Sequence, residues 1–238
     1  MVKQTALLTF LGFIFLVQVQ AQSIEEIVNK HLDAIGGKQK LATITSVKME
    51  NEMEVMGNSA TTTITILNGK GYKTESEIMG SKMVQVINDK GGWMINPMGG
   101  SSDPVDLPEA AAKQASGQLF IVPLLDYTAR GVKLTLEGKE TVGGGEAFKV
   151  KVTNKDGADV IMYIDATTYY LTRLVQTADV MGQTVTNTIT YSDFKKTESG
   201  WVVAYTTDID MGGMFQLKNK LSKIEVNPTI DPAIFEKK

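Results

Sequence analysis

The sequence predicts a mainly β protein, a curved antiparallel half-barrel (an incomplete barrel) of about eleven strands covered by short helices. Three observations predict it. Apolar and polar residues alternate with a period of two over most of the chain. Glycine-containing turns recur about every 8 to 12 residues, and only two long stretches are typical of helices. Long strands with one apolar face and little helix to cover them favour a curved sheet over a flat sandwich.

The first 21 residues have the features of a cleaved signal peptide. Lys3 supplies a positive charge, residues 6–17 form an apolar run, and Val19-Gln20-Ala21 has the small residues of a cleavage site. A membrane anchor is the alternative, but the run is shorter than the roughly 20 residues of a spanning helix. We therefore expect cleavage after Ala21, and residues 22–238 as a single periplasmic domain.

Composition excludes several classes of function. The absence of cysteine excludes disulfides, thiol nucleophiles and zinc–thiolate sites. A single histidine, His31, excludes multi-histidine metal sites and leaves a Ser-His-Asp pattern only if His31 is its centre. A net charge of −3 with two arginines provides no basic surface for nucleic acid. We expect a protein that is not an enzyme and has no metal, cofactor or nucleic-acid partner.

One helix and five strands are expected before the middle of the chain. Ser23 is a good N-cap, residues 24–35 carry apolar side chains at helical spacing, and Gly36-Gly37 ends this helix. Residues 38–41 are expected to add one more turn. The five strands are expected at residues 47–55, 61–67, 72–79, 83–88 and 93–96, with a loop at 96–104.

Residues 103–117 are expected to form a central helix. Pro108 suits a first helical turn, Ala110-Ala111-Ala112 has high helix propensity, and Gly117 suits a left-handed stop. Apolar residues 119–125 fit either a short strand or more helix. The strands then resume, at residues 132–136, 148–152, 160–164, 169–180, 184–194, 201–210 and 214–226, and a tail at 227–235 can pack back.

Three weaker signals have plain structural explanations. His31 lies beside apolar Leu32 and is expected to be a structural histidine. The loop at 154–159 has oxygen ligands at alternating positions but lacks the bidentate glutamate of a calcium loop, so a turn fits better. Asp208 and Asp210 share a strand face and could act as a carboxylate pair, although no nucleophile can be assigned beside them.

Methionine is frequent on the expected apolar faces. The chain has 12 methionines, and flexible thioether side chains suit surfaces that adapt to varied apolar ligands, although they also fill gaps in ordinary cores. An apolar cavity is expected inside the half-barrel. Its candidate lining residues are Met49, Met53, Val55, Ile64, Ile66, Met83, Trp93, Phe148, Val150, Val152, Met162, Ile164, Leu171, Ile189, Tyr191, Val203, Tyr205, Phe215 and Leu217. Its candidate lid residues are Leu107, Ala110, Ala111, Leu119 and Phe120.

Several short motifs occur in a distinctive order along the chain. They are Ala34-Ile35-Gly36-Gly37-Lys38, Gly92-Trp93-Met94-Ile95-Asn96-Pro97, Tyr163-Ile164-Asp165, Thr168-Tyr169-Tyr170-Leu171-Thr172-Arg173, Tyr191-Ser192-Asp193-Phe194 and the tail from Asn227-Pro228 to Phe235. In this order they resemble the LolA/LolB-like periplasmic lipoprotein carriers, in particular the outer-membrane lipoprotein-sorting proteins. The resemblance implies a half-barrel whose apolar cavity shelters acyl chains. Such carriers use a strand arginine in gating, whereas the first strand here offers only Lys48.

The leading functional hypothesis is a non-enzymatic periplasmic carrier or binding protein for lipidated proteins or lipid acyl chains. Its expected partners are a lipid or acylated lipoprotein and membrane-associated donor or acceptor proteins, and its expected state is a monomer. The alternative is an interaction or scaffold protein with a filled barrel that acts through its surface, for example through the row Glu50, Glu52 and Glu54. A hydrolase that uses Asp208 and Asp210 is the third hypothesis.

Overall fold

The structure is a computed structural model that describes residues 22–55, 58–78, 80–155, 159–180, 183–213 and 216–237. The expected signal peptide and Phe215 lie outside these residues. Within them, no helix has the length and apolar character needed to cross a bilayer.

A single antiparallel sheet forms most of the molecule. Its thirteen strands follow the order β6-β5-β4-β3-β2-β1-β13-β12-β11-β10-β9-β8-β7, so β1 and β13 join two halves that are each built from consecutive strands. The strands are β1 (Ser46–Val55), β2 (Asn58–Leu67), β3 (Gly71–Ile78), β4 (Ser81–Asn88), β5 (Gly91–Asn96), β6 (Ser101–Asp106), β7 (Lys133–Val142), β8 (Gly145–Thr153), β9 (Asp159–Asp165), β10 (Leu171–Val180), β11 (Gln183–Lys196), β12 (Val202–Met211) and β13 (Gln216–Val226).

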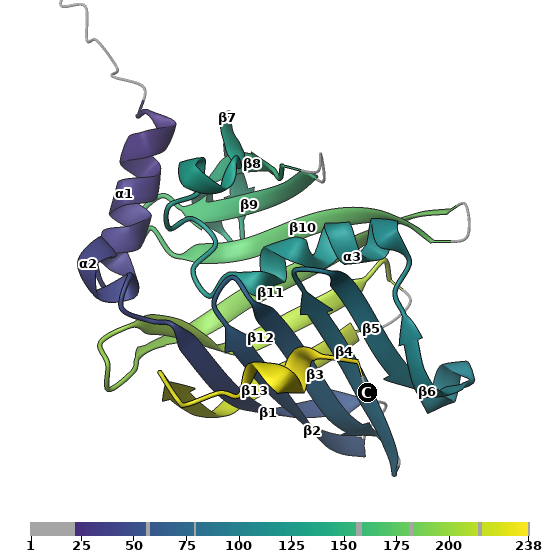
Figure 1. Cartoon of the computed structure of the whole chain (residues 1–238). Helices are drawn as coiled ribbons and strands as arrows, with labels where there is room; N and C mark the ends of the chain where they lie inside the picture. Colours follow the sequence, from purple (N-terminus) through teal and green to yellow (C-terminus); the bar gives the residue numbers. More distant parts are fainter. Residues whose placement is uncertain are drawn as a thin grey trace, which may run out of the picture.

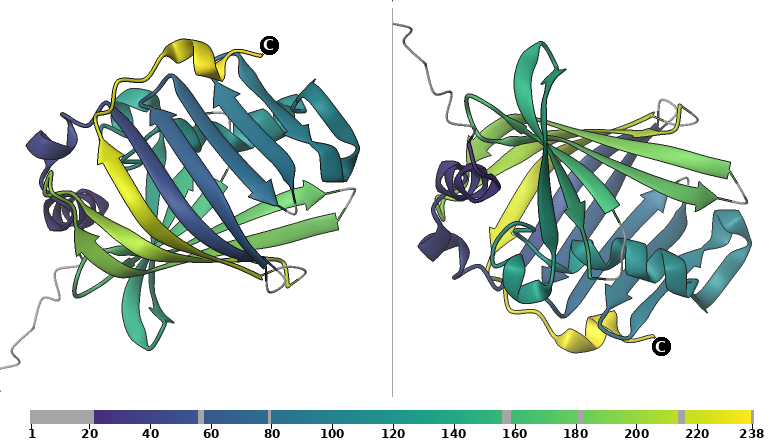
Figure 2. Two further views of the ribbon diagram at one scale, coloured as in Figure 1. Left: turned by 90° about the horizontal axis from the view of Figure 1, so that it is seen from below. Right: turned by 90° about the horizontal axis from the view of Figure 1, so that it is seen from above.

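The sheet curls into an open half-barrel, as Figures 1 and 2 show, which confirms the predicted fold class. The described residues form thirteen strands, where about eleven were expected. The short elements are α1 (Ile24–Ala34), α2 (Lys38–Leu41), η1 (Pro97–Gly99), α3 (Glu109–Ala115), η2 (Ser116–Leu119), η3 (Thr128–Arg130) and η4 (Pro232–Phe235). The Ser23 hydroxyl accepts a hydrogen bond from the Glu26 amide at 3.2 Å, so α1 begins at the predicted cap.

The expected central helix is shorter than predicted, because part of its range pairs with the sheet. Residues 101–106 form the edge strand β6, in which Asp106 pairs with Trp93 and Val105 with Met94. Pro104 is compatible with this position because an edge strand tolerates a missing amide donor. Helix α3 begins only after Pro108. Residues 119–125 are neither a strand nor an α-helix; they run through the end of η2 into turns.

Two hydrophobic clusters hold the fold together. The larger contains α1 residues such as Ile27 and the inward-facing strand residues Val47, Val150 and Ile164. The smaller lies on the outer face of the sheet, where the tail, residues 227–237, covers β4 and β5 through Phe235. The Trp93 indole donates a hydrogen bond to the Phe235 carbonyl at 3.2 Å. The tail therefore packs back as the sequence predicts, but outside the half-barrel (Figure 2).

Candidate ligand-binding site

The strand register identifies the inner wall, which we define as the side chains that face the concave side of the sheet. On β1 these alternate as Val47, Met49, Asn51 and Met53, and their neighbours on β2 and β13 face the same way because directly paired residues share a face. Across β2 they are Ile66, Ile64, Thr62 and Ala60, and across β13 they are Val226, Ile224, Leu221 and Asn219.

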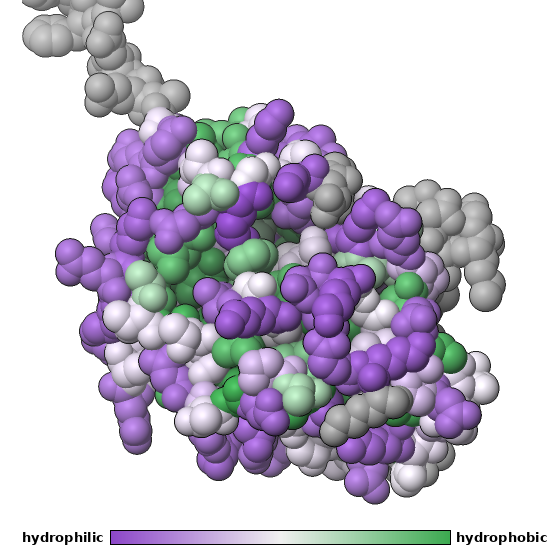
Figure 3. Space-filling view, in the orientation of Figure 1, coloured by the Kyte–Doolittle hydropathy of each residue, from purple (hydrophilic) through white to green (hydrophobic). Residues whose placement is uncertain are grey.

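The inner wall has a dense end and an open end. At the dense end, near α1, Val150 and Ile164 have 0% of their surface exposed. At the open end, toward the β10 residues that contact α3, apolar side chains such as Ile189, Ile209 and Leu217 are only partly buried, although they point to the concave side. The open end is therefore the part of the wall with apolar surface left to cover. Figure 3 views the molecule from the side of α3; the surface over this helix is mostly hydrophilic, and the largest recessed apolar area lies beside α1 and α2.

The predicted lining residues divide into buried and partly exposed side chains. Seven are buried, namely Met53, Ile66, Phe148, Val150, Val152, Met162 and Ile164. Nine are partly exposed, namely Met49, Ile64, Met83, Leu171, Ile189, Tyr191, Val203, Tyr205 and Leu217. Val55 lies in β1, but its side chain is outside the described part of the structure, as is Phe215.

The structure contradicts the prediction for Trp93, which lies on the outer face. Trp93 pairs with Val86, and both side chains belong to the cluster covered by Phe235. The neighbouring residues Gly92 and Met94 take the inner positions of β5. Four residues were expected for this strand, and so short a run does not establish which face is buried.

Helix α3 crosses from one half of the sheet to the other. On one side it packs against β5, and the Leu107 amide, just before it, donates a hydrogen bond to the Gly92 carbonyl at 2.9 Å. On the other side the Gln114 amide group donates to the carbonyl of Thr177 on β10 at 2.8 Å, and Gln176 donates back to the Gln114 carbonyl at 3.4 Å. Figures 1 and 2 show α3 lying across the opening.

The five predicted lid residues differ in their surroundings. Leu119 is buried and Leu107 partly buried, whereas Ala110 and Ala111 are exposed. Only Ala112 of the alanine run is buried, so the small-residue face predicted for the sheet side consists of that residue alone. Phe120 stacks under the Arg130 guanidinium, whose carbon lies 3.9 Å from the ring centre.

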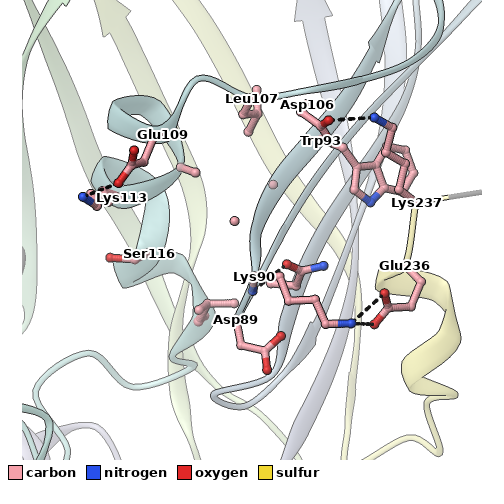
Figure 4. A pocket seen from close by; sticks show the side chains of 15 residues that line it. Asp89, Lys90, Trp93, Asp106, Leu107, Glu109, Lys113, Ser116, Glu236 and Lys237 are labelled. Carbon is pink, nitrogen blue, oxygen red and sulfur yellow. Dashed lines mark hydrogen bonds and ion pairs between the residues drawn. The ribbon is translucent and has the colours of Figure 1, made fainter.

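A cleft of about 700 Å³ lies between α3, the β4–β5 hairpin and the tail (Figure 4). Its apolar lining includes Trp93, Leu107, Ala112 and Leu119. Ion pairs surround this lining: Lys90 with Glu236 at 3.1 Å, Lys113 with Glu109 at 2.6 Å, and Lys237 with Asp106 at 2.9 Å. Exposed pairs of this kind contribute little to stability, so the rim can open at small cost. The volume is typical of small-molecule sites.

Two tyrosines, Tyr72 and Tyr191, lie on the concave side of the sheet. Burial raises the pKa of Tyr191 to about 12. Burial also raises the pKa of Tyr72, and the nearby Tyr191 raises it further. Because the charged form is disfavoured in an apolar environment, both phenols stay neutral and can donate hydrogen bonds at physiological pH.

His31 has a structural role in the dense end of the wall. It is 6% exposed, and its Nδ1 lies 2.8 Å from the carbonyl oxygen of Tyr169. Burial lowers the pKa of the imidazole, so the neutral ring donates this hydrogen bond and connects α1 to the β9–β10 turn.

The aspartates considered for catalysis have structural partners. Lys218 lies 3.7 Å from an oxygen of Asp208, and Asp210 accepts a hydrogen bond from the Gly213 amide at 2.7 Å. Both line a polar depression of about 580 Å³ on the outer face, opposite the concave side. Among the described residues, no group of three histidine, aspartate or glutamate side chains could hold a metal ion.

The row of glutamates on β1 lies beside a row of lysines on β13. Glu50 pairs with Lys223, Glu52 with Lys220 and Glu54 with Lys218 in the register. The acidic row is therefore compensated within the sheet and does not form a one-signed surface for a basic partner. Lys48 belongs to the same outer row, opposite Glu225, so it does not occupy the position of a cavity-gating arginine.

Solved structures with this fold confirm the predicted resemblance at the level of the fold. An outer membrane lipoprotein-sorting protein domain from Vibrio parahaemolyticus has a TM-score of 0.58 and 14% identity, covering 89% of this chain and 95% of its own. A LolA superfamily protein from Nitrosomonas europaea has a TM-score of 0.59 and 13% identity, covering 91% and 99%. A DUF1329 family protein from Desulfovibrio piger has a TM-score of 0.55 and 13% identity, covering 91% and 98%. No protein-family model and no curated protein sequence matches the chain.

Proposed function

We propose that this protein is a non-enzymatic periplasmic carrier or binding protein for lipid acyl chains or lipidated proteins. One observation carries the proposal: apolar side chains such as Ile189 and Leu217 point to the concave side but stay partly exposed, and a helix bridges the two halves of the sheet. An acyl chain that covers these side chains would complete their burial.

The gain from such burial is large enough for binding without polar chemistry. Each buried methylene contributes about 0.8 kcal/mol, so one long acyl chain supplies roughly 10 kcal/mol before ordering costs. We infer that α3 acts as the lid and that the cleft beside it, lined by Leu107 and Leu119, is the entrance. The two amide hydrogen bonds of Gln114 hold this lid.

The periplasmic location and the partners are part of the same proposal. Residues 1–21 are proposed to direct export and to be removed after Ala21. The domain then works as a monomer that receives its cargo from one membrane-associated protein and delivers it to another. The fold that the chain shares with an outer membrane lipoprotein-sorting protein domain is compatible with such a carrier role.

A cross-link between α3 and β10 tests the proposal. The chain has no cysteine, so the double variant Gln114→Cys/Gln176→Cys can be joined specifically by a short bismaleimide. We expect the cross-linked protein to take up radiolabelled palmitate at least about 10-fold more slowly than the same variant capped with N-ethylmaleimide. Equal uptake rates would show that α3 is not the lid.

A second measurement tests the cargo itself. Native mass spectrometry of the protein purified from a periplasm is expected to show bound acyl lipid. If no lipid copurifies, and if delipidated protein gains no thermal stability from palmitate, the carrier proposal is wrong and a surface-acting scaffold becomes the better explanation.

A further inference from the structure

A band of polar side chains crosses the inner wall between two apolar regions. The register places Ser76 opposite Thr62, Thr62 opposite Asn51, Asn219 opposite Thr207 and Thr207 opposite Tyr191, and Asn51 and Asn219 lie on neighbouring strands. The band thus runs over six adjacent strands from β3 to β11. None of these six side chains carries a charge at neutral pH.

One oxygen of this band is left without a partner. The side-chain oxygen of Asn219 is buried and has no hydrogen bond to any described residue. At the other end of the band, Thr62 and Ser76 satisfy each other at 2.8 Å. Buried polar atoms are nearly always paired, so an amide oxygen in this position calls for a donor from outside the chain.

A second unpartnered oxygen lies beneath α3. The side-chain oxygen of Asn187 is also buried without a partner among the described residues. Asn187 pairs with Gln176, the residue that donates to Gln114. Two amide oxygens therefore face the concave side without a partner, that of Asn187 near α3 and that of Asn219 in the polar band.

Apolar side chains flank the band on both sides. Met49 and Ile64 lie on one side, and Ile209 and Leu217 lie on the other. A ligand that covers both flanks of the band would place its apolar part against these four residues. A polar group next to its acyl chain would then lie against Asn219 and Tyr191.

We propose that Asn219 and Tyr191 recognise an uncharged polar group with hydrogen-bond donors, such as a hydroxyl or an amide N–H, next to the acyl chain of the ligand. The proposal rests on the carrier function proposed above and narrows its ligand class. Asn219 accepts a hydrogen bond from this group, and the Tyr191 phenol can donate one to it. A bare ester or hydrocarbon has no hydrogen-bond donor and therefore leaves the Asn219 oxygen without a partner.

Two probes with the same acyl chain test the proposal, 1-monopalmitoylglycerol with free hydroxyls and methyl palmitate without a donor. Affinities are measured by competition with a fluorescent fatty acid. We expect the wild-type protein to bind the glyceride about 10-fold more tightly, the factor that corresponds to about 1.4 kcal/mol. In Asn219→Leu the preference for the glyceride over methyl palmitate should fall to about 2-fold or less, while the affinity for methyl palmitate stays unchanged. Asn29→Leu, on the exposed surface of α1, is the matched control.

Tyr191→Phe provides a second variant that preserves the shape of the wall. It is expected to lower the ratio as well, while unfolding at the wild-type temperature within a few degrees. The inference is overturned if the wild-type protein binds both probes equally, or if both variants keep the wild-type ratio. If neither probe binds to any form, the carrier function itself is wrong, an outcome distinct from equal binding.

Discussion

The dense and open ends of the inner wall are built from the same sheet but are covered by different helices. Helix α1 brings large apolar side chains such as Ile27 and Leu32, which complete a core with Val150 and Ile164. Helix α3 brings only Ala112 to a buried position and is held to β10 by amide hydrogen bonds. A helix with so little apolar surface can cover the concave side of the sheet without filling the space beneath it. This difference separates the structural part of the wall from the proposed ligand site.

The largest expected effect comes from matched isoleucines at the two ends. Ile164→Ala should lower the free energy of unfolding by about 3 to 4 kcal/mol, because it leaves a cavity in a fully buried site. Ile189→Ala, on the partly exposed wall, should cost about 1 kcal/mol and weaken palmitate binding. Urea unfolding measures both. Equal losses would mean that the two ends are packed alike.

The outer cluster should affect stability without affecting the wall. Phe235→Ala is expected to cost about 3 kcal/mol by removing the ring that covers Trp93. Gly71→Ala should release the same ring, because a Cβ at Gly71 would overlap it. Gly145→Ala, where a Cβ meets only ordinary contacts, is the control. In a Trp201→Phe background, the fluorescence of Trp93 should shift to longer wavelength in Phe235→Ala and Gly71→Ala but not in Gly145→Ala. An unchanged spectrum in all three variants would mean that the Phe235 ring does not shield Trp93.

High pH should destabilise the folded protein through the two tyrosines of the concave side. The pKa of Tyr191 is about 12 in the folded protein, and that of Tyr72 is also raised, against about 10 when unfolded. The folded state therefore keeps protons that the unfolded state loses, and stability falls as pH rises above 10. At pH 11 the wild-type protein should have lost about 2 kcal/mol more than Tyr72→Phe/Tyr191→Phe. Parallel pH profiles would show that these phenols are not buried.

Low pH should destabilise the dense end. The pKa of His31 is lowered in the folded state, so the unfolded state binds the proton more readily once the pH falls below about 6.5. The wild-type protein should lose about 1 kcal/mol more than His31→Gln between pH 7.5 and 5.5, since glutamine does not titrate. Thermal unfolding across this range checks the sign. A profile that is the same for both proteins would contradict the assignment.

The smallest expected effect concerns the hydrogen bonds that hold α3. Gln114→Ala removes the donor to Thr177 and should destabilise the closed position of the helix by about 0.5 to 1 kcal/mol. Amides of residues 109–115 should then exchange with deuterium a few-fold faster, and palmitate should dissociate faster. Gln118→Ala, at an exposed position, is the control. Unchanged exchange would mean that α3 is held by its contact with β5.

Local sequence patterns were sufficient to predict many helices and strands, but not which face of every strand is turned to the concave side. The alternation in residues 47–55 predicted β1, and the N-cap and spacing of residues 23–35 predicted α1. The outer position of Trp93 was missed because its strand was read as only four residues long. Strand β6 was missed because Pro104 and nearby serines are typical of loops, whereas its pairing with β5 depends on the sheet edge.

The sequence by itself determined the fold class, because a period of two with regular turns leaves few ways to bury the apolar faces. It also determined the absence of thiol chemistry in a chain without cysteine. Only the tertiary structure decided that α3 bridges β5 and β10 and that the buried oxygens of Asn187 and Asn219 lack partners in the described residues. These features depend on contacts between residues more than sixty positions apart, such as Gln114 and Thr177, which no local pattern specifies.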